Sequence, residues 1–254
     1  MFLNKKYIYA VISFSLIVLL WQMVVVFSGW SVQVFPGPLV VFYSFIELVS
    51  NGALFNHSVA SLYRVTTGFY LGAVLGVPLG IILGRSVTVK QLVNPVIQFL
   101  RPISPLAWIP LSMLWFGLGD KPAIFLIFLS SFFPIVVATT IAVNSINPIY
   151  FQVASNFNLS RLEMLTKIVV PAIIPEVVTA LRLTIAIAWL VVVAAEMIAV
   201  QSGLGYLILD SRNALRMDYV MVAMIVIGLI GLLLDFIMYK LGKLEPMLAA
   251  GRNR

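Results

Sequence analysis

NPIYFQVASNFNLSRLEMLTKIVVP, residues 147–171, is the longest polar-bearing stretch that lies between two strongly apolar ones. Asn147 is a good N-cap and Pro148 a good first helical residue, so a helix is predicted to begin here. Asn158 tolerates the left-handed conformation that often ends a helix. The predicted helix carries one apolar face, made by residues at helical spacing: Tyr150, Val153, Ala154 and Phe157.

A second helix is predicted to follow the turn at once. Ser160 and Glu163 have the spacing of a capping box, in which each side chain accepts a hydrogen bond from the other residue's backbone N–H. Pro171 is predicted to end or kink this second helix. Residues 147–171 should therefore form a short helix, a tight turn and another helix, set between two membrane spans.

The composition is that of a membrane protein. Hydrophobic residues make up 62% of the chain and charged residues 10%, whereas soluble domains are about half apolar and about a quarter charged. The chain has no cysteine, which excludes disulfides and thiolate metal sites, and a single histidine, which argues against a histidine metal cluster. We therefore expect an all-α polytopic membrane protein.

Hydropathy divides the chain into six predicted transmembrane helices, the third of which is interrupted by prolines. They are Tyr7–Phe27, Val65–Leu83, Leu92–Phe116, Ala123–Val143, Leu183–Val200 and Val220–Tyr239. Between the first two, a helix over Leu39–Val49 is predicted to lie at the outer surface, because it is too short by about a third for a seventh span.

The net charge of +7 reflects orientation in the membrane, so no nucleic-acid partner is expected. Basic residues gather in the loops on one side: Lys5, Lys6, Arg85, Lys90, Arg161, Lys167, Lys240, Lys243, Arg252 and Arg254. The opposite loops hold only Arg64, Lys121, Arg212 and Arg216, with acidic residues nearby. The positive-inside rule therefore places both termini and residues 147–171 in the cytoplasm, with the chain in the plasma membrane.

The second predicted span has a glycine at every fourth position: Gly68, Gly72, Gly76, Gly80 and Gly84. Such glycines let another helix approach closely, so helix packing is the expected role. At about 100° per residue a step of four drifts by about 40°, and the stripe winds around its helix. We therefore expect at least two neighbouring helices along it.

The third predicted span contains four prolines between Pro95 and Pro110, which cannot lie in one straight helix. Broken helix inside a membrane is tolerated where it is buried or lines a cavity, which favours a translocation path here. A kinked packing helix with Arg101 reaching the interface is the alternative. Candidate path-lining residues are Arg101, Ser104, Trp108, Ser112, Ser130, Ser131 and Thr139.

Two charged residues of the fifth predicted span are further candidates for the path. Glu196 is the one carboxylate well inside an apolar run, although it lies near the outer end, where it can pair with an arginine. Arg182 opens the span and could favour an anionic solute at the pore mouth. Asp235, near the inner end of the sixth span, is expected to be solvated.

Residues 147–171 resemble the cytoplasmic "EAA" loop of ABC importer permeases. Gln152-Val153-Ala154 stands at the E-A-A position, Asn158 at the glycine, and the segment ends with Pro171, with every interval matched. The resemblance implies a coupling helix that docks on a separate ATPase subunit. The residues it marks for this role are Tyr150, Gln152, Val153, Ala154, Phe157, Asn158, Leu159, Glu163 and Pro171.

Further runs resemble permeases of the nitrate, sulfonate, taurine and bicarbonate branch, from about Phe35 to Glu245. They are RPISPLAWIPL at 101–111, GLGD at 117–120, AAEM at 194–197 and GLGY at 203–206. The resemblance implies the MetI-like ABC importer permease fold and a permease core at 65–245. Residues 1–64 would hold the first span and the outer helix, and residues 246–254 a cytoplasmic tail.

The resemblance also implies partners. A homodimer would enclose the pore, an external substrate-binding protein would deliver the solute, and ATP with Mg would bind on the partner ATPase, leaving this chain without a cofactor. The sequence has no G-x-x-x-x-G-K-[ST] phosphate loop of its own. Nitrate, bicarbonate, cyanate, taurine, alkanesulfonates and vitamin precursors stay open as solutes.

An ion-coupled secondary carrier and an intramembrane enzyme are the alternatives to the importer. An ion-coupled secondary carrier needs its own coupling site near the midplane, and Glu196 is the only candidate acid. An intramembrane enzyme needs a nucleophile–base pair or metal ligands, and the sequence shows no such constellation.

Overall fold

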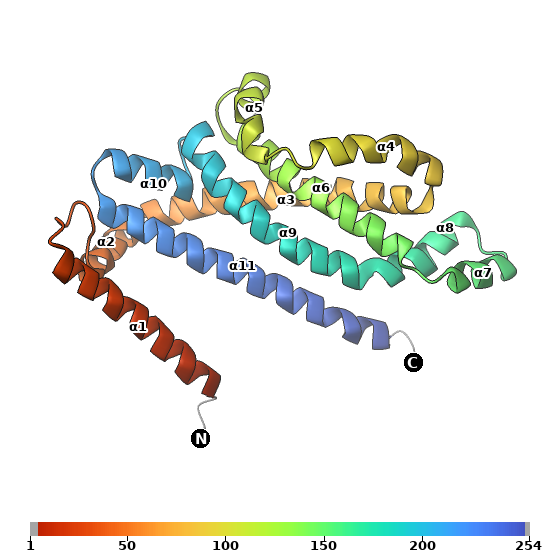
Figure 1. Ribbon diagram of the computed structural model, residues 1–254, viewed down its shortest axis with the longest axis horizontal. Coiled ribbons are helices and arrows are strands. Elements are labelled where there is room, and N and C mark those ends of the chain that lie inside the picture. Colours follow the sequence, from red (N-terminus) through yellow and green to blue (C-terminus); the bar gives the residue numbers. More distant parts are fainter. Residues whose placement is uncertain (1–4, 252–254) are drawn as a thin grey trace.

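The structure is a computed structural model that describes the backbone of residues 5–251 and the side chains of residues 8–9 and 11–242. The side chains of Lys5, Lys6, Lys243, Arg252 and Arg254, used above for orientation, lie outside these ranges, as do residues 252–254 of the predicted tail. The described chain is all-helical (Figure 1). Its elements are α1 (Lys5–Ser28), α2 (Pro38–Ser50), α3 (Ala53–Arg85), α4 (Val87–Leu100), η1 (Pro105–Trp108), α5 (Ile109–Phe116), α6 (Asp120–Asn144), α7 (Pro148–Asn156), α8 (Arg161–Met164), the π-turn η2 (Leu165–Val169), α9 (Val170–Ala199), α10 (Leu204–Asn213) and α11 (Met217–Gly251).

Five stretches of continuous helix in the described chain are long and apolar enough to cross a membrane. They are α1, α3, α6, the run from α8 through α9, and α11. The third predicted span is instead divided into α4, η1 and α5, of 14, 4 and 8 residues. The prolines therefore interrupt this segment as predicted, and none of its pieces is long enough to span alone.

A seam between α3 and α6 is the central packing feature. A Cβ atom added at Gly68, Gly72, Gly76, Gly80 or Gly84 would in each case meet α6. Their respective neighbours are Ile127, Ser131, Ile135, Thr139 and Val143, so both helices contribute every fourth residue. Small residues thus bring the two backbones together along the whole stripe, as GxxxG patterns do in membranes.

The expectation that this stripe needs two neighbouring helices is wrong. The single helix α6 meets all five glycines because its own contact residues share the same spacing. The contacts recur every four residues, whereas one turn of an α-helix holds 3.6 residues. A contact repeat longer than one turn stays on the same side of both helices if the two helices wind around each other in a right-handed supercoil.

The relative direction of α3 and α6 determines the path of the segment that connects them. Gly68 meets Ile127 and Gly84 meets Val143, so α3 and α6 are parallel. The chain leaves α3 at one end of the seam and starts α6 at the other, so residues 86–119 travel back along the bundle. Figure 1 shows this return through α4 and α5. The broken segment therefore supplies the sixth crossing of the predicted six-helix fold.

The remaining long helices complete the bundle. The α9 helix packs on α6, and α11 packs on α9 and on α2. Figure 1 shows α1 diverging from α11, and the apolar stretch of α1 over Val11–Ser28 has no buried residue. Helix α2 confirms the short helix predicted at Leu39–Val49.

Two helix starts were predicted too late. The α3 helix begins at Ala53 and α9 at Val170, so Arg64 and Arg182 lie within helices, not in a loop or at a span's start. Pro171 does not end the second helix of residues 147–171, and the other predicted outcome, a local disturbance of the helix, is the one observed. Pro171 follows the π-turn η2, whose wider spacing absorbs the disruption that proline causes in a regular helix.

Candidate functional site

The elbow, residues 147–171, has the local structure predicted for its first turns. The Oδ1 atom of Asn147 accepts a 3.0 Å hydrogen bond from the N–H of Ile149 and caps α7. Asn158 ends the helix with φ 50°, in the left-handed region. Ser160 and Glu163 form the complete capping box, with N···O distances of 3.0 and 3.3 Å. These sequence predictions are confirmed.

Glu163 also forms an ion pair on the elbow surface, outside the predicted spans. Lys167 Nζ lies 2.8 Å from Glu163 Oε1, one helical turn away. Hydrogen bonds from Lys167 and then from Ser160 lower the pKa of Glu163 to about 2. The carboxylate therefore stays charged at neutral pH, and its capping bonds would be lost only as the pH falls below about 4.5 toward 2.

The elbow exposes large apolar side chains at positions outside the predicted spans. Phe157 is 76% exposed and Tyr150 60%. Three more are also exposed: Ile149, Val153 and Leu162. Several exposed apolar side chains on one short segment are typical of a protein–protein contact where such a segment faces water.

Ala154 is the exception on the predicted apolar face. It is only 1% exposed, so it points into the chain's own body and is unavailable to a partner. The helical spacing was right, but Ala154 lies at the boundary between the inner and outer sides of α7. A bulky substitution there would disturb the elbow itself.

The elbow is fastened to the membrane helices by Phe151 and Arg85. Phe151 packs against a core cluster contributed by the ends of α6 and α9. The Arg85 guanidinium, at the end of α3, lies 4.2 Å from the centre of the Phe151 ring and donates to the sulfur of Met164 at 3.1 Å. These contacts join the elbow to the end of α3, beside the last glycine of the α3–α6 seam.

A cavity of about 200 Å³ lies between the break in the third segment, the middle of α6, and α9. Arg101 and Trp108 contribute from the break, Ser130 and Pro134 from α6, and Ile187 from α9. The structure thus brings together three of the predicted path residues, Arg101, Trp108 and Ser130. Ser104 is exposed nearby without lining the cavity.

Three of the serine hydroxyls predicted to line the path are bonded within their own helices. Ser112, Ser130 and Ser131 each donate to a carbonyl of their own helix, at 2.7–2.9 Å. Ser131 and Thr139 face glycines of the α3–α6 seam, and Thr139 Oγ1 is buried without a hydrogen-bond partner. Backbone bonding of this kind is the usual habit of hydroxyls in helices, and sequence alone does not show which side they face.

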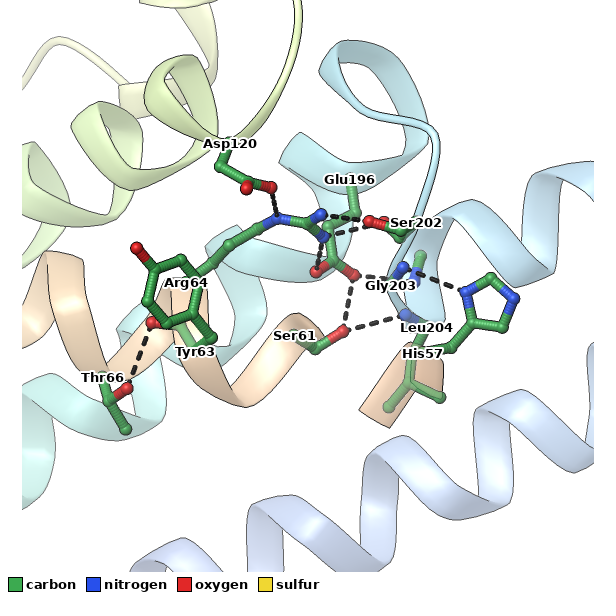
Figure 2. Close-up of polar contacts among 11 residues, drawn as sticks. His57, Ser61, Tyr63, Arg64, Thr66, Asp120, Glu196, Ser202, Gly203 and Leu204 are labelled. Atoms are coloured by element: carbon green, nitrogen blue, oxygen red, sulfur yellow. Dashed lines mark hydrogen bonds and ion pairs between the residues drawn. The ribbon is translucent and has the colours of Figure 1, made fainter. Parts of the chain in front are cut away.

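At the end of the bundle away from the elbow, a buried polar cluster joins α3, α6, α9 and the loop before α10 (Figure 2). We call it the Arg64–Glu196 cluster, made by Ser61, Arg64, Asp120, Glu196 and Ser202. Arg64 is 2% exposed and Glu196 0%. Arg64 Nη1 lies 2.7 Å from Glu196 Oε1, and its Nε lies 2.7 Å from Asp120 Oδ1.

Backbone groups complete the cluster. The second Glu196 oxygen accepts hydrogen bonds from Ser61 Oγ at 2.8 Å and from the N–H of Gly205 at 3.0 Å. Arg64 also donates to the backbone oxygen of Ser202, at 2.7 Å, and to its hydroxyl. A Cβ at Gly203 would collide with the Glu196 carboxylate, which explains the glycine there. Each charge in the cluster lies 2.7 Å from an opposite charge, with Arg64 shared between two carboxylates, so the cluster suits a structural role better than a solute site.

One part of this cluster was predicted from the sequence and another was not. Pairing of Glu196 with an arginine was foreseen, but Arg64 was placed in a loop. One signal was present, because Arg64 stands four residues before Gly68 and so continues the stripe that faces α6.

Arg182 is neutralised as well. Its Nε and Nη2 atoms each lie 2.7 Å from an oxygen of Asp235 on α11, and its guanidinium carbon lies 4.9 Å from the Tyr239 ring centre. Asp235 is 47% exposed, so its expected solvation stands, but the sequence did not predict its pairing with Arg182, which joins α9 to α11. Among the described residues, no group of three His, Cys, Asp or Glu is placed to hold a metal ion.

Comparisons with known proteins give one consistent family. Residues 76–244 match the model of the family described as binding-protein-dependent transport system inner membrane component. A Methanocaldococcus jannaschii protein described as an ABC transporter permease is 40% identical, covering 87% of this chain and 84% of that protein. A Bacillus subtilis protein described as an aliphatic sulfonates transport permease is 34% identical, over 87% and 80% of the two chains.

Two further comparisons agree with these. The nitrate import permease of Leptolyngbya laminosa is 40% identical over 72% of this chain and 65% of its own. Among solved structures, a chain of the MetNI methionine ABC transporter superposes with a TM-score of 0.65 at 16% identity, covering 79% of this chain and 97% of that one. The last similarity supports the predicted MetI-like fold alone.

Proposed function

This chain belongs to the binding-protein-dependent transport system inner membrane components, the permease subunits of ABC importers, and we propose that it carries a small oxyanion. ATP hydrolysis in this family belongs to a separate partner subunit, so the chain is a transport subunit and not an enzyme. Family membership replaces the ion-coupled carrier that the sequence had left as an alternative.

The proposed solute class is the nitrate/bicarbonate or sulfonate/taurine type. Besides the nitrate and sulfonate relatives, the taurine permease of Escherichia coli and the bicarbonate permease of Synechococcus elongatus are each 34% identical to this chain. These solutes share a small size and a negatively charged, oxygen-bearing group. An external substrate-binding protein would choose among them and deliver the solute.

The elbow is the proposed contact with the ATPase, and the exposed apolar side chains of α7 are the observation that supports it. Phe157, Tyr150 and Val153 are too exposed and too apolar for a free cytoplasmic surface. Burying two or three such side chains in a partner groove would contribute several kcal/mol, at about 1.5–3 kcal/mol each. The proposed orientation places the elbow and both termini in the cytoplasm.

The proposed mechanism is alternating access in a homodimer. ATP-driven closure of the two ATPases would move the elbow, and the link from Phe151 to Arg85 would pass this movement to α3. Because α3 and α6 are packed glycine against side chain along their whole seam, they would move as one body. The cavity beside α6 would then open toward one side of the membrane and afterwards the other.

Uptake into proteoliposomes tests the proposal. The permease is reconstituted with its ATPase, with ATP on the elbow side and a loaded binding protein on the other. Labelled nitrate, bicarbonate or taurine should accumulate only with ATP and the ATPase. Accumulation driven by a proton or sodium gradient without the ATPase, or accumulation of none of these anions, would refute it.

A further inference from the structure

Arg101 occupies an unusual position in this fold. It caps the end of α4, where the chain breaks before η1, and its side chain lines the 200 Å³ cavity together with Trp108 and Pro134. The other large contributors to the cavity wall are apolar, and no acidic residue lines it.

The depth of the cavity follows from its place on α6. Ser130 and Pro134 lie 10 and 14 residues after the start of α6 at Asp120, and the helix ends at Asn144. At 1.5 Å per residue, both lie roughly 15–21 Å from each end. The cavity, and Arg101 with it, is therefore near the middle of a membrane span.

The charge of Arg101 is not neutralised within the described chain. The other two arginines that lie within the bundle, Arg64 and Arg182, each form a 2.7 Å ion pair with a carboxylate. Arg101 has neither an ion pair nor a side-chain hydrogen bond to any described residue. A positive charge facing lipid at this depth is costly, so an unpaired arginine here requires water or an anion.

We propose that Arg101 is the cationic contact that an anionic solute meets halfway along its path. This inference rests on the proposed function and assigns its central residue. The serine hydroxyls nearby are committed to helix carbonyls, so the contact offers one positive charge and mostly apolar walls. Such a site selects the sign of the charge and a small size without distinguishing nitrate from a sulfonate. Selection among oxyanions then falls to the binding protein.

The test uses the complete transporter, with its ATPase and binding protein, in proteoliposomes. Arg101→Gln removes the charge and Arg101→Lys keeps it. Lys90→Gln is the matched control, because it removes one positive charge from α4 at a position that does not line the cavity. The readouts are uptake of labelled nitrate and labelled taurine, ATP hydrolysis, and co-purification of the ATPase.

Arg101→Gln should lower anion uptake by about tenfold to a hundredfold, the loss expected for one charge-assisted hydrogen bond. ATP hydrolysis and ATPase co-purification should stay near wild type, Arg101→Lys should keep most of the uptake, and Lys90→Gln should resemble wild type. Wild-type uptake by Arg101→Gln would overturn the inference while leaving the proposed function standing. Absence of ATP-dependent anion uptake by the wild-type transporter would instead refute the proposed function.

A charge-restoration experiment keeps the inference testable if Arg101→Gln folds poorly. The natural chain has no cysteine, so Arg101→Cys creates the single thiol of the permease. Modification with a cationic methanethiosulfonate should restore uptake, and modification with an anionic one should not, with the identically treated wild type as control. Equal recovery with both reagents, or a thiol that neither reagent reaches from water, would overturn the inference.

Discussion

Removal of either partner of the Arg64–Glu196 pair should destabilise the permease strongly and unequally. Arg64→Met leaves the Glu196 carboxylate, which is 0% exposed, with hydrogen bonds only from Ser61 and Gly205. An uncompensated buried charge costs about 3–5 kcal/mol. Glu196→Gln should cost less, about 2 kcal/mol for one charged hydrogen bond, because Arg64 keeps Asp120 as a counter-ion.

The assay is denaturant unfolding of the purified permease in detergent micelles, followed by tryptophan fluorescence. The double variant Arg64→Met/Glu196→Gln should lose less than the sum of the two single variants, with a coupling energy of at least about 1 kcal/mol. Lys167→Met is the control, because it breaks the 2.8 Å ion pair with Glu163 on the exposed elbow surface and should change the free energy of unfolding little. Additive single variants, or an Arg64→Met loss no larger than that of Lys167→Met, would refute the reasoning.

Other substitutions test the seam and the elbow. Gly80→Ala places a Cβ 2.5 Å from the Cβ of Thr139 and should lower the free energy of unfolding by about 1–3 kcal/mol in the same assay. Gly228→Ala is the control, because a Cβ added there meets nothing within 4 Å. Equal losses of stability in the two variants would contradict the close contact. Thr139→Val removes the hydroxyl that has no hydrogen-bond partner, so the free energy of unfolding should stay unchanged or rise by about 1 kcal/mol. Uptake of the solute should be preserved, and a loss of uptake would instead assign Thr139 to the path. Asn158→Val forces a β-branched residue to φ 50° and should make the elbow cleavable by proteases, while Asn158→Gly should not; resistance of both variants would contradict the role of the turn.

Local signals in the sequence were sufficient for the elbow. Asn147, Asn158 and the Ser160–Glu163 box act through bonds to their near neighbours, so the turns they specify do not depend on the rest of the fold. The prolines of the third span act locally too, and the break appears where they predicted it.

Features that depend on distant contacts were predicted less well. The glycine stripe signalled close packing, but the single partner depends on residues of α6 that lie about sixty positions away. Hydropathy placed Arg64 outside the membrane, because a charged residue lowers the mean hydropathy of the segment that contains it. In the fold, Arg64 is paired with Glu196 and lies inside a helix. The inner and outer sides of α7 could not be separated either, since the apolar face continues from buried Ala154 to exposed Val153.

The central claim is that the elbow lies in the cytoplasm and binds the ATPase, and cysteine labelling tests it most directly. Phe157→Cys on the elbow and Leu118→Cys between α5 and α6 replace side chains that are both 76% exposed, in a chain without other cysteines. The account predicts that Phe157→Cys reacts only from the cytoplasmic side and cross-links to the ATPase, whereas Leu118→Cys reacts only from outside and does not. Labelling of Phe157→Cys from the outer side, or cross-linking of the ATPase at Leu118→Cys alone, would contradict it.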